Sequence, residues 1–384
     1  MKLKIKSQPE DFIVDEIATI PILKHGPYAV YKMTKRGWNT MDALRQIADH
    51  AQVPHTKLSY GGKKDRHALT YQHITVEGKP IEPFKHDNIK LDHLGFSDQP
   101  MSAGLMEGNR FKITIRQITP EQIKGAAKAL ESVKASGYPN YFDDQRFGSW
   151  DPKEGFIAEK ILKEHYNVAV KIFLTAIHYE EKSGDKARKQ FFSKHWREWD
   201  VCLKEAKTGA ERKAFSDLSK KQPNALENIL RAIPREDLSM AFSAYQSFLW
   251  NELVRRLIAK KAVDSPLKSV RGVVGDYIFY ERLERIPYDY LKKLKLQTAA
   301  SNTRMPDNLT EILYAKLLKE REVTPIMFKT MNFQSFFKAY ERSVLIKPKD
   351  LSWEAHSDHL ILSFSLPKAA YGTILIKRLF VNEP

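Results

Sequence analysis

The order of strand-like and helix-like segments constrains the fold of this chain more than any other feature of its sequence. Strand patterns and one helical pattern fill about the first 150 residues, lysine-rich helical patterns follow, and strand patterns return near the end. A helix-rich block between two strand-rich blocks predicts an insertion, with the N- and C-terminal segments sharing one sheet. Because strands and helices do not alternate in the regular βαβ order of a doubly wound sheet, the predicted fold class is α+β.

The first block contains the clearest local patterns. Residues 28–33 have the pattern of a short strand. Asn39 then offers a capping side chain to a helical pattern that ends before Pro54. Residues 68–76 have strand propensity, and residues 110–116 alternate apolar and polar side chains, as in a strand with one buried face. This part of the chain therefore predicts several strands and at least one helix.

The middle of the chain predicts long helices, and its end predicts strands. Helical texture runs over residues 155–177 and 217–258. Strand texture returns over residues 343–347, 359–364 and 372–380. We expect these last three segments to complete the sheet begun by the first block.

The balance of charges points to a polyanionic partner. Lysine and arginine number 63 against 47 aspartates and glutamates, which gives a net charge of +16. Cations that lie along a phosphate backbone release its counterions, so this excess favours nucleic acid as the partner. A solvated cationic face on a protein with another function would give the same count.

Cysteine content and hydropathy bear on location. Cys202 is the only cysteine, which excludes an intrachain disulfide and a cysteine-rich zinc site and is typical of a reducing cytosol. No apolar run reaches the roughly 18 residues of a membrane helix. The first residues lack the apolar core of a secretion signal. We therefore expect a soluble, cytoplasmic protein without membrane contact.

Motifs for nucleotide cofactors and for acyl transfer are missing from the sequence. Residues 61–64 lack the spacing of a P-loop, no G-x-G-x-x-G opens a helix, and no G-x-S-x-G surrounds a serine. His356 and His359 have no evident third metal ligand, which is typical of surface histidines. The sequence gives little support for chemistry that depends on a cofactor or a metal.

One acidic side chain lies inside a cluster of cations. The segment YGGKKDRHALTYQ, residues 60–72, places Asp65 between Lys64 and Arg66. Such a carboxylate is either neutralised in a structural ion pair or kept ionised for chemistry, because nearby positive charge favours its ionised form. The residues of this segment alone leave both interpretations open.

Four other short segments combine polar groups with aromatic rings. They are Lys6–Phe12, Gly108–Phe111, Asn140–Gly148 and Leu366–Gly372. Each by itself fits a turn packed on the core, since Gly, Pro and Asn are typical turn residues. Aromatic rings beside cations also suit the binding of a flipped or single-stranded base.

Taken together, the five segments resemble one known family. In order along the chain they read K-x-x-P-E-D-F, G-x-K-D-R-H-A-x-T-x-Q, G-N-R-F, N-Y-F-x-x-Q-R-F-G and L-P-K-x-x-Y, which resemble the motifs of the TruD family of pseudouridine synthases. The chain departs from the family pattern at Asp143-Asp144, where a glycine and an acid are common. It departs again at Ala369-Ala370, where Gly-Ser is usual. Both departures change backbone freedom more than chemistry.

The resemblance implies a fold and a division into parts. The implied fold is a pseudouridine synthase core, a mixed, largely antiparallel sheet with flanking helices and a permuted strand order. Residues 1–151 would form the N-terminal part of this catalytic core, residues 152–338 an inserted helix-rich module, and residues 339–384 the strands that complete the core.

The resemblance also implies a reaction and a site. The reaction detaches uracil from its ribose, rotates it and rejoins it through C5, without cofactor or metal, and the implied substrate is uridine 13 of tRNA. No obligate protein partner is implied. Asp65 corresponds to the catalytic aspartate of the family. The residues implied to bind substrate are Lys6, Phe12, Arg66, Asn140 and Tyr371.

Two other functions and one local ambiguity stay open. A non-catalytic binder of structured RNA, such as a tRNA folding chaperone, would need the same pocket. A metal-dependent nuclease using Asp65 and His67 would need further ligands. The segment KARKQFFSKHWREW, residues 186–199, fits either an RNA grip or an amphipathic helix with buried aromatic side chains.

Overall fold

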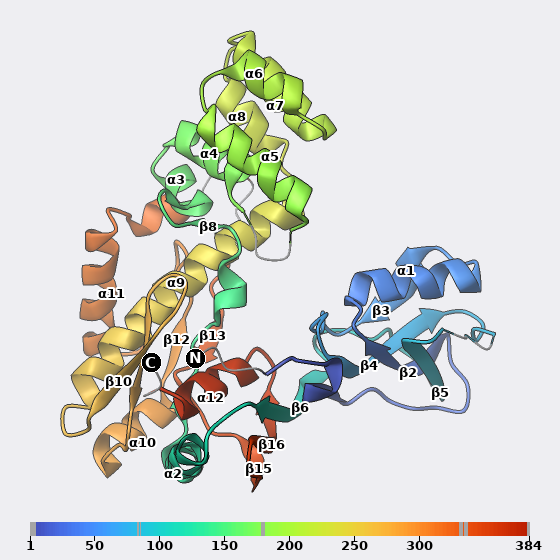
Figure 1. Cartoon of the computed structure of the whole chain (residues 1–384), viewed down its shortest axis with the longest axis vertical. Helices are drawn as coiled ribbons and strands as arrows, with labels where there is room; N and C mark the ends of the chain where they lie inside the picture. The colour runs from blue at the N-terminus through green and yellow to red at the C-terminus, as the bar shows by residue number, and fades with distance from the viewer. Residues whose placement is uncertain are drawn as a thin grey trace. The chain divides into compact units, whose positions relative to one another are not determined.

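The computed structural model in Figure 1 divides the chain into two compact units. The first unit combines Met1–Tyr138 with Ile346–Pro384, and the second is Pro139–Leu345. The structure describes residues 5–82, 84, 86–177, 181–329, 333 and 337–381.

A sheet of eight strands forms the centre of the first unit. Its order is β15-β16-β6-β1-β4-β2-β5, and β3 pairs with β4 beside this path. β1 and β4 run parallel, and the other neighbours run antiparallel. The strands are β1 (Phe12–Ala18), β2 (Tyr28–Arg36), β3 (Leu58–Tyr60), β4 (Leu69–Glu77), β5 (Ile89–Ser97), β6 (Met106–Arg116), β15 (Lys349–Ala355) and β16 (His359–Pro367).

The two ends of the chain do share this sheet. β6 lies between β1, from the start of the chain, and β16, from its end. The α+β class and the mixed, largely antiparallel sheet are therefore confirmed. The strand predicted over residues 110–116 is the second half of β6, and the one predicted over 359–364 lies within β16.

Helix α1 (Thr40–Ala51) covers one face of this sheet (Figure 1). The side chain of Asn39 caps it by accepting a hydrogen bond from the backbone N–H of Asp42 at 2.8 Å. Its apolar face belongs to the same buried cluster as alternate residues of β2 and β4, which explains why both strands and helix form here. This cluster includes Leu44 and Ile47 from the helix and Tyr31 and Met33 from β2.

The C-terminal segment predicted as a strand is a helix, which corrects the prediction for residues 372–380. Helix α12 (Gly372–Leu379) packs against α2 (Pro120–Ser136). Its β-branched residues favour strands by local propensity, yet the pairs Ile374–Arg378 and Leu375–Leu379, four residues apart, are buried. Burial of this helical face against α2 outweighs the propensity.

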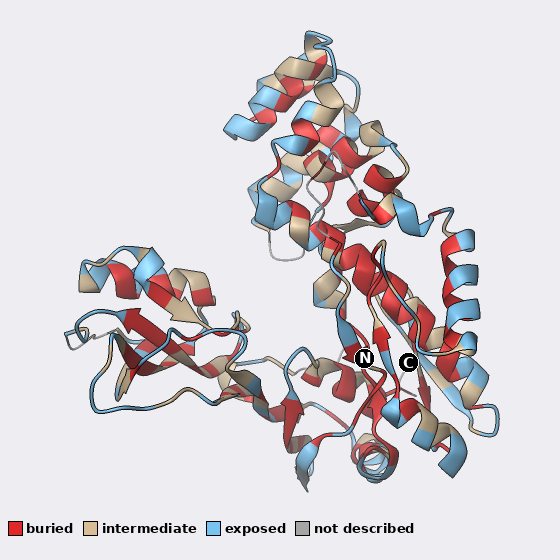
Figure 2. Cartoon of the chain, turned by 180° about the vertical axis from the view of Figure 1, so that it is seen from behind, coloured by how far each residue is buried: buried red, intermediate tan, exposed pale blue. Residues whose placement is uncertain are grey.

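Helices dominate the second unit. Its longest helix, α9 (Arg235–Lys261), is buried along much of its length, as Figure 2 shows in red. The other helices are α3 (Ile157–Leu162), α4 (Tyr166–Thr175), α5 (Ser183–Lys194), α6 (Trp199–Glu205), α7 (Gly209–Ser219), α8 (Ala225–Arg231), α10 (Arg285–Lys293) and α11 (Asn308–Glu320). Short strand pairs are β10 (Leu267–Arg271) with β11 (Asp276–Tyr280) and β12 (Lys295–Gln297) with β13 (Glu341–Ser343).

The two long helices expected in this unit are broken. A turn with Glu164 at φ 58° separates α3 from α4 within residues 155–177. Asn224, at φ 54°, precedes α8, and Pro234 caps the start of α9, so residues 217–258 contain the end of α7 and two further helices. The strand expected over residues 343–347 is divided between the end of β13 and a two-residue strand, β14 (Leu345–Ile346).

The module predicted over residues 152–338 lies inside the second unit, whose limits are 139 and 345. Its boundaries stay a prediction. Within the ranges that the structure describes, none of the helices combines the length and hydropathy that crossing a bilayer requires.

Candidate active site

Asp65 lies in the loop between β3 and β4. β3 pairs with Ile74–Val76 and β1 pairs with Leu69–Tyr71 of the same strand. β2 pairs with all of β4, Leu69 to Glu77, so β1 and β3 share its other edge. The loop therefore leaves the sheet where β1 and β3 meet along β4. This position places Asp65 beside the start of β1.

Among the residues that the structure describes, the carboxylate of Asp65 has two partners. Its Oδ2 forms an ion pair with the Nζ of Lys6, and its Oδ1 accepts a hydrogen bond from the backbone N–H of His67 at 3.0 Å. The side chain is 22% exposed and that of Lys6 is 25% exposed. The carboxylate is thus held in place and still reachable by a substrate.

Phe12 lies directly against Lys6. The Nζ of Lys6 is 4.4 Å from the centroid of the Phe12 ring, a cation–π contact. The ring is 4% exposed, and Phe111 of β6 meets it edge-on at 6.2 Å. The turn before it is fixed by Asp11, which is buried and pairs with Arg116 at 2.8 Å. In this structure Phe12 supports the lysine that faces Asp65.

The sheet brings three of the sequence motifs side by side. Gly108 of β6 pairs with Ile17 of β1 and with Pro367 of β16, so the G-N-R-F and L-P-K segments form neighbouring strands. Phe111, in the same motif, stacks on Phe364 at 5.2 Å. Segments that are distant in sequence therefore lie side by side with β1.

Polar side chains hold the backbone of the Asp65 loop. The hydroxyl of Thr40, at the start of α1, accepts a hydrogen bond from the N–H of Lys64 at 2.9 Å and donates one to the Oε1 of Gln72 at 3.2 Å. The Nε2 of Gln72 donates to the carbonyl oxygen of Gly62 at 3.3 Å. Thr40 and Gln72 are both buried. This chain of hydrogen bonds ties the loop to α1 and β4.

Lys35, near the end of β2, holds the same loop at a third point. Its side chain is fully buried, and its Nζ donates to the carbonyl oxygens of Trp38 at 2.6 Å, Asp65 at 2.7 Å and Lys64 at 3.4 Å. Burial lowers the pKa of Lys35 to about 8, although the charge of Asp65 acts in the opposite direction.

Lys64, the residue before Asp65, forms a buried ion pair. Its Nζ lies 2.6 Å from the Oε2 of Glu16 in β1. The Oε1 of Glu16 accepts a hydrogen bond from the backbone N–H of His73 at 2.9 Å. Burial is the largest influence on the pKa of Glu16 and raises it. The hydrogen bonds from His73 and the charge and hydrogen bond of Lys64 together outweigh burial, so the pKa lies below its ordinary value.

Two further predicted residues belong to the first unit. Arg66 is exposed, and the ion pair with Asp65 that its position suggested is made by Lys6. Tyr371 is half-buried and lies at the N-cap position of α12, without a capping hydrogen bond from its side chain. The following residue, Gly372, lies against the ring of Phe111, which places Tyr371 close to the aromatic cluster that contains Phe12.

Asn140 belongs to the second unit and is buried there. Its Nδ2 donates to the carbonyl oxygen of Ser343 at 3.1 Å, and its Oδ1 accepts from the guanidinium of Arg342 at 2.7 Å. Arg342 also lies over the rings of Phe142 at 4.1 Å and Trp250 at 5.2 Å. The amide of Asn140 therefore helps to fix the N-Y-F segment. A contact with the target base stays a prediction.

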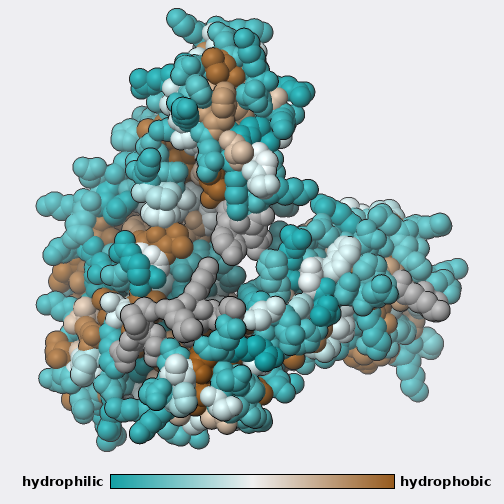
Figure 3. Space-filling view, in the orientation of Figure 1, coloured by the Kyte–Doolittle hydropathy of each residue, from teal (hydrophilic) through white to brown (hydrophobic). Residues whose placement is uncertain are grey.

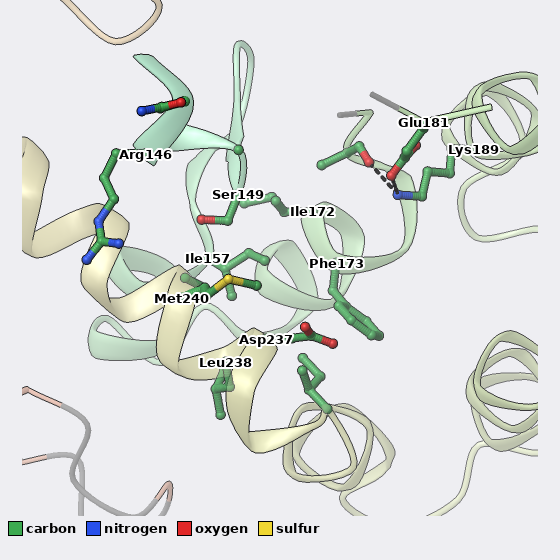
Figure 4. Close-up of a pocket in the computed structure, with 15 residues that line it drawn as sticks. Arg146, Ser149, Ile157, Ile172, Phe173, Glu181, Lys189, Asp237, Leu238 and Met240 are labelled. Carbon is green, nitrogen blue, oxygen red and sulfur yellow. Dashed lines mark hydrogen bonds and ion pairs between the residues drawn. The ribbon is translucent and has the colours of Figure 1, made fainter. Parts of the chain in front are cut away.

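The second unit also contains a cavity of about 470 Å³ (Figure 4). Ile157, Ile172 and Phe173 line it, and Glu181 and Lys189 form an ion pair at one side. None of the residues predicted for catalysis or substrate binding lines this cavity.

The segment over residues 186–199 is partly buried. Phe192 is fully buried and contacts Phe215 at 4.7 Å, as the amphipathic-helix interpretation expected. Arg188 pairs with Asp185 at 2.8 Å and with Glu211 at 3.0 Å, so its charge is already compensated within the unit. An RNA grip by the remaining cations stays a prediction.

The sequence interpretation missed Lys35 and Glu16, which shape the Asp65 loop in the first unit, and Arg342, which holds Asn140 in the second unit. A signal existed for the first of them. Tyr31 and Met33 alternate on the apolar face of the predicted strand, and Lys35 continues that alternation into the core. The partners of Glu16 and Arg342 come from distant segments, and no local pattern identifies such pairs.

The nuclease hypothesis requires a set of metal ligands around Asp65. In the described part of the chain, no three His, Cys, Asp or Glu side chains gather in a way that would hold a metal ion. The polar groups within hydrogen-bonding distance of the Asp65 carboxylate are an ammonium and a backbone N–H, which bind a carboxylate and do not bind a cation.

Comparison with known proteins agrees with the motifs. The family model described as "tRNA pseudouridine synthase D (TruD)" matches residues 1–379. A "Probable tRNA pseudouridine synthase D 1" from Methanococcus maripaludis is 33% identical, over 98% of this chain and 99% of the relative. The "tRNA pseudouridine synthase D" of Aquifex aeolicus is 28% identical, over 100% and 99%.

A solved structure is similar along nearly the whole chain. It is described as the "Putative tRNA pseudouridine synthase D (TruD)" of Methanosarcina mazei. The TM-score is 0.73 at 26% identity, and the match covers 98% of this chain and 93% of the other. Motifs, fold and full-length similarity agree. The chain therefore belongs to the TruD family and is a tRNA pseudouridine synthase, an isomerase.

Proposed function

We propose that this chain converts uridine 13 of tRNA to pseudouridine with Asp65 as its catalytic carboxylate and without a cofactor. One observation carries the proposal: Asp65 is partly exposed, paired with Lys6, and fixed in a loop whose backbone is held at several points. Membership of the family supports this reaction, and the geometry of the loop supports Asp65 as the residue that performs it.

The carboxylate of Asp65 suits either route to the product. The reaction breaks the bond from N1 of uracil to C1′ of ribose and forms one from C5 to C1′, after which the proton on C5 is lost and N1 is protonated. Asp65 can attack C1′ as a nucleophile, or stabilise positive character there and take up a proton. In both routes the ion pair with Lys6 orients the ionised carboxylate.

Other predicted residues take binding roles around Asp65. The exposed guanidinium of Arg66 is available for the phosphate next to the target nucleotide. Tyr371 and Phe12 are proposed to contact the base, and the ring of Phe12 also supports Lys6. Asn140, in the second unit, is proposed to contact the base in the bound tRNA. Because bases inside an RNA helix are hard to reach, the target uridine must be flipped out of the folded tRNA.

The net charge of +16 supports tRNA as the partner. With a single cysteine in the chain, the cytoplasm is the proposed location. The inserted module is proposed to span residues 152–338 and to add to the binding of tRNA.

Release of tritium from tRNA labelled at C5 of uridine tests the role of Asp65. The wild-type protein should release tritium, and Asp65→Asn should release none while still binding tRNA. Asp92→Asn is the matched control, because Asp92 lies on β5 in an exposed ion pair with Lys90 and should leave the rate unchanged. Lys6→Met should lower the rate at least about tenfold, because one charge-assisted hydrogen bond to the reacting carboxylate is lost.

Two outcomes contradict the proposal. Equal release by wild type and Asp65→Asn would remove Asp65 from catalysis. Binding of tRNA by the wild type without any tritium release would favour a non-catalytic tRNA chaperone.

A further inference from the structure

Lys35 is a fully buried lysine whose ammonium group contacts the loop of Asp65. Lysines are almost never fully buried unless their charge is paired or used. An apolar side chain at this place in β2 would continue the apolar face of Tyr31 and Met33 at no electrostatic cost. Stability of the core therefore does not explain why an ammonium group lies here, and we look for a role in the site.

The three hydrogens of the ammonium group match three acceptors. They are the main-chain carbonyl oxygens of Trp38 at 2.6 Å, Asp65 at 2.7 Å and Lys64 at 3.4 Å. A protonated lysine has three donors and no lone pair, so this arrangement uses its full hydrogen-bonding capacity. A neutral amine has two donors and one lone pair. Loss of the proton therefore leaves one carbonyl without a partner and turns a lone pair toward it.

These contacts act on the residue that carries the reaction. Lys35 fixes the carbonyl of Asp65, Thr40 fixes the N–H of the residue before it, and Lys6 fixes the carboxylate. With both the backbone and the side chain held, the Asp65 carboxylate has little freedom to turn. Positioning of a reacting group within a fraction of an ångström controls rates strongly, so a contact of this kind affects chemistry more than binding.

We propose that Lys35 is a positioning residue for pseudouridine formation, which holds the backbone of Asp65 so that its carboxylate meets the ribose of the bound uridine. This inference rests on the proposed catalytic role of Asp65. The ammonium group of Lys35 acts through Asp65 and does not touch the substrate.

Protonation of Lys35 gives the inference a second readout. Burial lowers the pKa of Lys35 to about 8. The charged groups that face it are Asp65, which favours the ammonium form, and Lys64, which opposes it, and their own partners are Lys6 and Glu16. As pH rises through about 8, Lys35 loses its proton and one of its three hydrogen bonds. The rate of the chemical step should therefore fall on the alkaline side of this value.

Single-turnover kinetics on tRNA provide the test. Lys35→Met should lower the maximal rate by about 10²-fold, the effect of a small misplacement of a reacting group. Its KM and its affinity for tRNA should stay at the wild-type values. The fall in rate above pH 8 that is expected for the wild type should be absent from the variant.

Lys90→Met is the matched control. Lys90 lies on β5 opposite Thr34 of β2, is exposed and pairs with Asp92, and it makes no contact with the Asp65 loop among the described hydrogen bonds and ion pairs. The Lys90→Met substitution removes the same charge as Lys35→Met and should keep the wild-type rate and pH profile. Circular dichroism checks that each variant is folded at the assay temperature.

A second variant keeps the inference falsifiable if Lys35→Met does not fold. Lys35→Gln retains two donors and cannot ionise, so its rate should lie between those of wild type and Lys35→Met and show no fall near pH 8. A folded Lys35→Met within about threefold of the wild-type rate would overturn the inference, because positioning effects are larger. A change in KM alone, or an alkaline fall that persists in Lys35→Gln, would also overturn it.

Asp65→Asn, measured in parallel, separates the two proposals. If Asp65→Asn is inactive and folded Lys35→Met is fully active, only the positioning role of Lys35 fails. If Asp65→Asn is active, the proposed function itself fails.

Discussion

At the scale of single residues, the cations around Asp65 have different tasks. Lys6 pairs with the carboxylate itself, and Lys35 binds the backbone carbonyl of the same residue. Lys64 turns away to a buried ion pair with Glu16, while Arg66 lies in solvent. Positive charge near Asp65 is thus divided between a pair with the carboxylate, a contact with the loop backbone and an exposed guanidinium.

Replacement of Glu16 by Gln should destabilise the first unit. The side chain of Glu16 is fully buried. Glutamine has no negative charge, so the substitution leaves the buried ammonium of Lys64 without a counter-charge. Breaking a buried ion pair by removing one partner costs about 3–5 kcal/mol. Urea unfolding at neutral pH measures the loss. Asp92→Asn, at an exposed ion pair, should change the unfolding free energy by less than about 1 kcal/mol.

The pH dependence of the same variant has a definite sign. Because the folded protein holds the pKa of Glu16 below its ordinary 4.5, the ion pair stabilises the fold above this value and loses its contribution as pH falls below it. The difference in unfolding free energy between wild type and Glu16→Gln should therefore shrink on acidification below pH 4.5. A difference that grows toward acid would contradict the assignment.

Ala369→Gly should stabilise the protein. Ala369 has φ 65°, in the left-handed region, at the position where the family usually has glycine. In this conformation a residue with a Cβ is strained by about 1–2 kcal/mol, and glycine relieves that strain. Glycine also raises the entropy of the unfolded chain, which lowers the free energy of unfolding by about 0.5–1 kcal/mol. A net stabilisation of about 0.5–1 kcal/mol is expected in thermal or urea unfolding.

The neighbouring Ala370→Gly is the control for this change. Ala370 is not among the residues with positive φ, so glycine relieves no strain there and should destabilise by about 0.5–1 kcal/mol. Equal effects of the two glycines would show that the backbone at Ala369 is not strained.

At the scale of elements, the contact between β6 and β16 explains a glycine of the G-N-R-F segment. A Cβ on Gly108 would lie 2.2 Å from the carbonyl oxygen of Leu366 in β16. The two backbones therefore approach too closely for any other residue. The segment that leads to Tyr371 depends on this approach, since β16 runs directly into it.

Gly108→Ala should destabilise the first unit by at least about 1–3 kcal/mol, because the strands must separate to admit the methyl group. Gly125→Ala is the matched control. A Cβ on Gly125, in the exposed face of α2, meets nothing within 4 Å, so alanine should stabilise by about 0.5–1 kcal/mol through helix propensity. Urea unfolding of both variants checks the pair, and a neutral Gly108→Ala would contradict the close approach.

Local pattern predicted those elements whose packing agrees with their propensity. Residues 110–116 alternate because one face of β6 is buried, and Asn39 caps α1 as its side chain chemistry suggests. The strand predicted over residues 372–380 was wrong. Their β-branched side chains favour a strand locally, but one face of the helix they form is buried against α2. The motifs predicted Lys6 and Asp65 as site residues one by one. Their ion pair was not predicted, because the two residues are 59 positions apart and only the folded sheet brings them together.

At the scale of the whole molecule, charge governs the meeting with tRNA. The chain carries a net charge of +16, and Figure 3 shows a face that is largely hydrophilic. An excess of cations favours binding to phosphates through counterion release, which depends on salt and not on the reacting residue. We therefore expect affinity and catalysis to rest on different groups of side chains.

The affinity for tRNA should fall steeply with salt. If about six phosphates are contacted, the binding constant drops by roughly 10³-fold between 50 mM and 200 mM salt. Filter binding or fluorescence titration at several salt concentrations measures the slope. Asp65→Asn should give the same slope as the wild type, and a binding constant that does not respond to salt would contradict the phosphate-dominated interaction.

The place of β6 between β1 and β16 has a consequence for the growing polypeptide on the ribosome. Lys6, Lys35, Thr40 and Gln72 all emerge early, so the grip on the Asp65 loop can form while the second unit is still being translated. β16 emerges only after that unit. Until then the edge of β6 that it covers is unpaired, and open strand edges recruit other chains. We therefore expect the Asp65 loop to assemble before β16 covers this edge of β6, so that pairing with β16 protects the sheet from aggregation.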